Sequence, residues 1–89
     1  MFGWKIYKVG GHSMEPTLKP GQYVLARSTS NVQPGDIVIC NYDRQLFIKR
    51  VKSKQDHGYN IKGDNTSGQD SRDFGLISPE SIVSKVIWH

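Results

Sequence analysis

The sequence predicts an all-β fold, a small coiled antiparallel sheet or partly closed barrel. Two observations support this prediction. Glycine and proline recur along the whole chain and leave segments too short for ordinary helices. The segments between them are rich in Val, Ile, Tyr, Phe and Trp, which favour strands. Several short strands joined by turns are typical of a small sheet or barrel. The 89 residues have room for one core, so we expect residues 1–89 to form a single domain.

Six strands are expected in chain order: residues 4–9, 22–27, 36–42, 46–53, 59–62 and 82–88. The pairs at 20–21 and 34–35 each fit a turn with proline first and glycine second, and residues 43–45 fit a hairpin loop. The polar, glycine-rich segment 61–75 resembles no strand. We expect it to be a hydrogen-bonded loop in which Asp70 and Arg72 form an ion pair.

The composition also narrows the classes of function. No apolar run approaches the roughly 18 residues that span a bilayer, so no stable membrane insertion is expected. The N-terminus lacks the apolar core and cleavage site of a secretion signal, which predicts a cytoplasmic protein; a trimmed core of a longer protein would instead be membrane-associated. Basic and acidic residues are interspersed despite the net charge of +4, so no nucleic-acid partner is expected.

Cysteine and metal chemistry are not expected either. Cys40 lies inside an apolar run, which predicts a small buried hydrophobe and not a nucleophile. The three histidines are dispersed, and the carboxylates of the polar loop do not have the spacing of an EF-hand. We therefore predict no metal and no other cofactor.

Ser13 is the first candidate for a catalytic role, in the segment GGHSMEPTL at 10–18. The glycines before it let a bound peptide approach the backbone closely, and Pro16 stiffens the turn behind it. A serine in such a setting is more often a turn or cap residue. The catalytic interpretation therefore depends on finding a base.

Lys49 is the candidate base, in the segment LFIKRV at 46–51. Strand alternation places it on the same face as Phe47 and Val51. If that face is the core side, burial disfavours the ammonium ion and lowers the pKa of the lysine, as a lysine needs if it is to take a proton from serine. A lone lysine in a strand is far more often a surface residue.

Four segments together resemble the conserved boxes of the signal peptidase I family, in the same order. They are SMEPT at 13–17, GDIV at 35–38, KRV at 49–51, and GDN at 63–65 with DSR at 70–72. Each box is weak alone, but four in order are a specific signal. The resemblance implies a coiled β-fold with Ser13 as nucleophile and Lys49 as general base, without a catalytic histidine. It also implies that Gly11, His12 and Met14 lie at the oxyanion hole or the bound substrate.

The chain departs from that family at three places. Gly11 stands where many bacterial signal peptidases have a serine that helps the oxyanion hole, so Gly11→Ser would restore a donor if Gly11 does not need a positive φ. The loop between GDN and DSR is one residue shorter than usual. We assign the lysine-orienting serine to Ser67, with Asp70 and Arg72 structuring the loop. Residues 1–89 include no segment that we expect to act as that family's membrane anchor or membrane-contacting insertions.

A small core of this kind is most similar to the nickel-type superoxide dismutase maturation proteases. The expected function is thus a Ser/Lys endopeptidase that removes an N-terminal leader or propeptide from a protein substrate, with the propeptide of nickel-type superoxide dismutase as the specific candidate. The self-cleaving domains of SOS-response repressors share this chemistry, but the GDN and DSR boxes point away from them. Two alternatives stay open: the excised catalytic core of a signal peptidase I, and a non-catalytic β-domain that binds peptide or nucleic acid.

Overall fold

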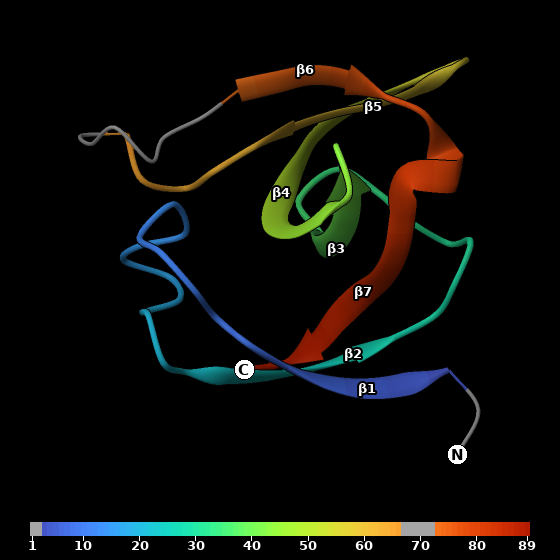
Figure 1. Ribbon diagram of the computed structural model, residues 1–89. Coiled ribbons are helices and arrows are strands. Elements are labelled where there is room, and N and C mark those ends of the chain that lie inside the picture. The colour runs from blue at the N-terminus through green and yellow to red at the C-terminus, as the bar shows by residue number, and fades with distance from the viewer. Residues whose placement is uncertain (1–2, 67–72) are drawn as a thin grey trace.

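The computed structural model describes residues 3–66 and 73–89, which form one antiparallel sheet of seven strands in the order β1-β2-β7-β3-β4-β5-β6. The elements are β1 (Trp4–Lys8), β2 (Tyr23–Arg27), β3 (Ile37–Tyr42), β4 (Gln45–Gln55), β5 (Gly58–Lys62), β6 (Asp73–Ile77), the 3-10 turn η1 (Pro79–Ser81) and β7 (Ile82–Trp88). The sheet coils, with β1 and β2 on the side of the molecule opposite β5 and β6, and β7 running between them (Figure 1). The predicted all-β antiparallel fold is confirmed. The sheet does not close into a barrel, because β1 and β6 are its two edges.

All six predicted strands are present, with ends shifted by at most two residues. The prediction was wrong for β6, which lies at the end of the segment expected to be a polar loop. Its apolar run is too short to indicate a strand by itself. The strand exists because its backbone pairs with β5, where Tyr59 lies opposite Ile77 and Ile61 opposite Gly75.

The predicted turns are confirmed. Each proline–glycine turn is closed by a backbone hydrogen bond of 3.1 Å. The hairpin between β3 and β4 is tighter than expected, since Tyr42 already pairs with Gln45. Its two loop residues, Asp43 and Arg44, have φ of 53° and 65°, the left-handed conformations of a type I′ turn, whose twist matches the flanking strands.

Apolar cores lie on both faces of the sheet, because neighbouring residues of a strand point to opposite sides. The first core packs segment 9–18 against β2 and consists of Val9, Met14, Leu18, Val24 and Ile37. The second lies over β3, β4 and β5 and consists of Val32, Val38, Cys40, Val51, Tyr59, Ile61 and Ile77. Phe47 packs against the second core, so the face of β4 that carries Phe47, Lys49 and Val51 is the core side, as predicted. No helix in the described part of the chain has the length and apolar character to cross a bilayer.

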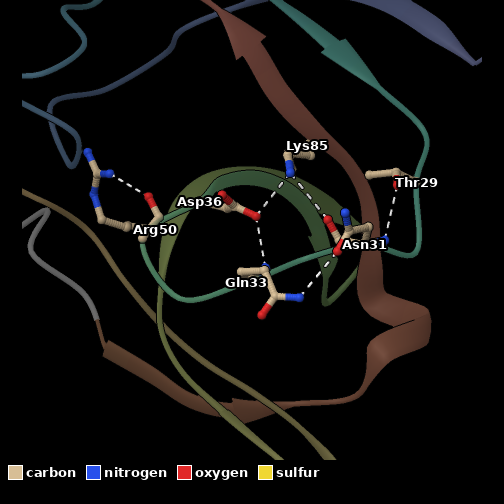
Figure 2. A network of polar contacts seen from close by, with 7 residues as sticks. Thr29, Asn31, Gln33, Asp36, Arg50 and Lys85 are labelled. Atoms are coloured by element: carbon tan, nitrogen blue, oxygen red, sulfur yellow. Dashed lines mark hydrogen bonds and ion pairs between the residues drawn. The ribbon is translucent and has the colours of Figure 1, made fainter.

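Polar contacts from β4 and β7 hold the loop between β2 and β3 (Figure 2). The ammonium of Lys85 donates to the carbonyl of Asn31 at 3.3 Å and lies 3.3 Å from the Asp36 carboxylate. Arg50 donates from Nη1 to the carbonyl of Gly35 at 2.7 Å. These contacts fix the loop at Gly35 and Asp36, the first two residues of the GDIV box, and connect it to the strand that carries Lys49.

Candidate active site

Ser13 lies in a compact turn that two buried side chains anchor to the first core. Met14 and Leu18 are 1% and 0% exposed and belong to the first core. Inside the turn, the Leu18 N–H donates to the Met14 carbonyl at 2.9 Å. Ser13 itself is half-buried. The apolar anchors thus fix the backbone of the turn while the serine stays at the edge of the core.

The GDN segment packs directly against this turn. The Asn65 backbone N–H donates to the Ser13 carbonyl at 2.8 Å, and the Asn65 side-chain amide donates to the His12 carbonyl at 2.9 Å. At Gly63, a Cβ atom would lie only 2.6 Å from the Ser13 carbonyl oxygen. Only glycine allows this close approach, so two boxes about 50 residues apart in sequence meet at Ser13.

Gly63→Ala is therefore expected to displace the Ser13 turn. Overpacking of this kind costs about 1–3 kcal/mol of unfolding free energy. We also expect the peptide-cleavage rate of the folded protein to fall by about tenfold or more, because small displacements of reacting groups are costly. Gly58→Ala is the matched control, since its Cβ would meet the Ile77 carbonyl oxygen instead of Ser13. It should lower stability but not kcat/KM, and equal losses of kcat/KM in both variants would contradict the placement of Gly63 at the site.

Lys49 is buried at 2% exposure on the core side of β4. Its Nζ lies 5.9 Å from the centroid of the Phe47 ring. Lys49 and Ser13 both line one cavity of about 240 Å³. The other residues around this cavity are Gly10, Gly11, His12, Gln45 and Phe47. The structure therefore brings the predicted nucleophile and the predicted base to the same small space.

A larger cleft of about 400 Å³ adjoins this cavity and shares Ser13 with it. It runs between the end of β1 and the beginning of β4, and its apolar lining consists of Tyr7, Val9, Met14, Ile39, Leu46, Phe47 and Ile48. Met14 contributes as a buried part of the floor and of the first core, and not as an exposed binding group. The dimensions and lining suit an extended peptide with apolar side chains.

Gly11 and His12 line the small cavity beside Ser13. Gly11 has φ of +73°, a conformation that strains any residue with a side chain. The condition for Gly11→Ser to restore an oxyanion donor is therefore not met, and we no longer expect that substitution to raise activity. His12 is exposed, and its Nδ1 lies 2.7 Å from the Glu15 carboxylate. The expected lysine-orienting Ser67 and the expected ion pair of Asp70 with Arg72 lie outside the described residues.

A polar network that the sequence did not indicate connects three elements behind Ser13. Arg50 donates to the Asp64 carboxylate from Nε at 2.8 Å and from Nη2 at 2.7 Å. The Thr17 hydroxyl donates to the same carboxylate at 2.6 Å. Hydrogen bonds from Arg50, followed by the one from Thr17, hold the pKa of Asp64 below its usual value, although burial opposes this shift. The network ties β4 and the GDN segment to the serine turn.

Asp64→Asn should show what this network contributes. We expect a loss of about 1–3 kcal/mol of unfolding free energy at neutral pH, the range for hydrogen bonds to charged groups. Because folding lowers the pKa of Asp64, its contribution is present above the unfolded pKa of about 3.9 and is lost as the pH falls through the folded pKa. Denaturant unfolding from pH 7 to pH 2 should thus show the wild type and Asp64→Asn converging in acid. Asp56→Asn, at an exposed carboxylate, is the control, and a difference that persists unchanged in acid would contradict the assignment.

Comparison with known proteins identifies the family. The chain matches the family model described as Peptidase S24-like over residues 4–87. The chain belongs to this family. The match covers the serine turn, Lys49 and the GDN segment alike, and it supports a serine-peptidase type of activity on a protein substrate. No curated protein and no solved structure matches the chain. The narrower resemblance to signal peptidase I stays a prediction.

Cysteine chemistry does not compete with Ser13 in this S24-like peptidase. Cys40 is fully buried, as predicted, and its thiol donates to the Phe47 carbonyl at 3.6 Å. Burial raises the pKa of Cys40 to about 11, although the nearby Lys49 acts in the opposite direction. The thiol therefore stays protonated at neutral pH. Within residues 3–66 and 76–89, whose side chains the structure describes, no three side chains of His, Cys, Asp or Glu gather as metal ligands would.

Proposed function

We propose that this S24-like peptidase is a serine endopeptidase in which Ser13 is the nucleophile and Lys49 is the general base. The observation that carries the proposal is the shared cavity, lined by a half-buried serine and a lysine that is 2% exposed. A nucleophile needs a base within reach, and the base must be able to lose its proton near neutral pH.

The reaction divides into two half-reactions. The neutral amine of Lys49 takes the proton of the Ser13 hydroxyl as the serine oxygen attacks the scissile carbonyl carbon. The resulting oxyanion accepts a hydrogen bond from the Ser13 backbone N–H. The Lys49 ammonium then returns the proton to the leaving amine, and an acyl-enzyme remains on Ser13. Water, deprotonated by Lys49, attacks this ester, and the departing serine oxygen recovers the proton.

Burial and the neighbouring Phe47 ring act in opposite directions on the charge of Lys49. Burial disfavours the ammonium ion and can lower the pKa of a fully buried lysine by as much as about 3–5 units, which corresponds to roughly 4–7 kcal/mol. A cation–π contact favours the ammonium ion, but it is worth only about 1–2 kcal/mol and weakens toward about 6 Å. The Phe47 ring is 5.9 Å from Nζ, so this contact is weaker than the cost of burial, and under the proposal Lys49 acts as a neutral amine.

The substrate we propose is a protein with a cleavable N-terminal leader or propeptide, bound as an extended segment in the apolar cleft beside Ser13. The resemblance to maturation proteases predicted from the sequence makes the propeptide of nickel-type superoxide dismutase the first candidate. Under the alternative that the chain is the catalytic core of a signal peptidase I, the full gene would encode an apolar segment before residue 1. A non-catalytic β-domain would bind the same peptides without cutting them.

The test is co-expression of the wild-type chain or Ser13→Ala with candidate precursors, followed by mass measurement of their N-termini. The proposal predicts precursor shortened at one position with the wild type and intact with Ser13→Ala. Shortening of nickel-type superoxide dismutase precursor would support the specific substrate, and shortening of secretory precursors alone would support the signal peptidase alternative. Intact precursors in every case, together with no cleavage of peptides in vitro, would favour the non-catalytic domain.

A further inference from the structure

Among the described residues, one face of β1, β2 and β7 carries large apolar side chains that remain exposed. Ile6 pairs with Leu25, and Leu25 pairs with Trp88. A register shift between Leu25 and Ala26 separates this last pair from the pair of Ala26 with Val86, so Ile6, Leu25 and Trp88 form one row across the three strands. Ile6 is 63% exposed and Trp88 is 67% exposed. The opposite face of β2 carries the buried residues Val24 and Ala26. The row therefore lies on the side of the sheet that the first core does not cover.

A cation–aromatic pair borders each side of this row. Arg27 stacks over the Trp4 ring at 5.5 Å, and Lys8 lies over the Tyr23 ring at 6.0 Å. Both pairs are directly opposed in the register of β1 and β2. We call the whole surface the aromatic face; it consists of Trp4, Ile6, Lys8, Tyr23, Leu25, Arg27 and Trp88.

The charged side chains of β1, β2 and β7 are all basic. None of the strands β1, β2 and β7 contains an aspartate or glutamate, and Glu15 is the only acidic residue among residues 1–35. Among the described residues, Lys8 and Arg27 therefore share this surface with no aspartate or glutamate side chain of the three strands. A partner that covers the apolar row also has to approach these two cations.

We infer that the aromatic face binds a partner protein whose apolar contact surface is bordered by carboxylates. Trp, Tyr and Arg are the residues that most often dominate the energy of protein interfaces, and here the register of two strands holds them in place before binding. Exposed apolar side chains in one contiguous patch are typical of an interaction site. Carboxylates on the partner would pair with Lys8 and Arg27 at the border of the contact.

Three other occupants fit less well. A second copy of the chain would bring Lys8 and Arg27 against identical cations. Nucleic acid stacks its bases on free rings, whereas two of the three aromatic rings of this face, Trp4 and Tyr23, each have a cation over one side. Anionic membranes are usually recognised by clusters of about four to eight basic residues, more than this face offers.

The position of the face suggests what the contact does. β1 carries Trp4 and Ile6, and the chain continues from there through residues 7–11, which line the apolar cleft. A protein bound on the aromatic face would therefore lie beside the cleft. Three short strands offer a small contact area, which suits a transient complex. The inference does not require that Ser13 be catalytic.

The two tryptophans of the chain give a direct readout, because both lie on the aromatic face. Their indole N–H signals can be followed by NMR in the wild-type chain during titration with a synthetic peptide that has a leucine-rich centre and glutamate flanks. We expect saturable shifts of both signals, with an apparent Kd about tenfold lower than for the same peptide with lysine flanks. The double variant Lys8→Glu with Arg27→Glu should weaken binding of the glutamate peptide by about tenfold.

The matched control is Lys52→Glu with Lys54→Glu, which changes the net charge equally at exposed positions of β4. It should bind the glutamate peptide within about twofold of the wild type. Equal shifts with both peptides, or equal losses in both double variants, would overturn the inference. It would also be overturned if the indole signals respond only to phosphatidylglycerol vesicles, to single-stranded DNA or to the concentration of the chain itself. The comparison of the two peptides uses only the wild-type chain, so it tests the inference even if a variant does not fold.

Discussion

Ser13→Ala is expected to abolish peptide-bond cleavage, with a loss of about 10⁴-fold or more, because the attacking oxygen is removed. The fold should remain. The contacts that fix the turn come from the Ser13 backbone carbonyl, which accepts the Asn65 N–H, and from the buried side chains of Met14 and Leu18. Alanine keeps all of them, so we expect the unfolding free energy to change by less than about 1 kcal/mol.

A peptide library made from a digested proteome measures this effect, because it offers the enzyme many cleavable sequences at once. Mass spectrometry of the new termini should find a reproducible set with the wild type and none with Ser13→Ala. Ser30→Ala, at an exposed loop serine, is the matched control and should give the wild-type set. The same new termini produced by purified, folded Ser13→Ala would show that another residue is the nucleophile.

Lys49→Met is expected to be equally inactive, yet at least as stable as the wild type. Methionine keeps most of the apolar stem in the space beside Phe47 and removes the amine, whose burial is costly. Lys49→Arg should also be inactive, because the guanidinium stays charged and cannot accept the serine proton. Cleavage of library peptides and thermal unfolding of the same samples provide the two measurements.

Lys52→Met is the control for these variants, since it removes an exposed amine from the same strand. It should cleave as the wild type does. Substantial cleavage by Lys49→Met would exclude Lys49 as the base. A strongly destabilised Lys49→Met would instead mean that the buried amine makes contacts that stabilise the fold, contrary to the expected cost of its burial.

The fold was largely predictable because local signals agree with it. Proline–glycine turns and β-branched segments mark six strands, and alternation along β4 correctly predicts that Lys49 shares the core side with Val51. β6 was not predictable, since its own residues carry a weak signal and its backbone is ordered by pairing with β5. Whether the sheet closes into a barrel depends on how strongly it coils, and the residue pattern of a single strand does not predict that.

The sequence singles out Ser13 and Lys49, which line one cavity, but not the residues that support them. In the KRV box, the sequence indicates a role for Lys49 but none for Arg50, although Arg50 donates two hydrogen bonds to Asp64. Thr17 and Asp64 are 47 positions apart in sequence, so their contact depends on the packing of the turn against the GDN segment. The requirement for glycine at position 63 likewise depends on this packing, because a Cβ atom there would meet the Ser13 carbonyl oxygen.

The pH dependence of peptide cleavage tests the Ser13–Lys49 mechanism most directly. Because the neutral amine is the active form, kcat/KM of the wild type should rise with pH through one ionisation, at a pKa well below the value of about 10.4 for an unperturbed lysine. The same profile should persist in His12→Ala, and cleavage should be absent at every pH in Lys49→Met. A profile with a pKa near that of histidine, about 6.5, which disappears in folded His12→Ala, would contradict the mechanism.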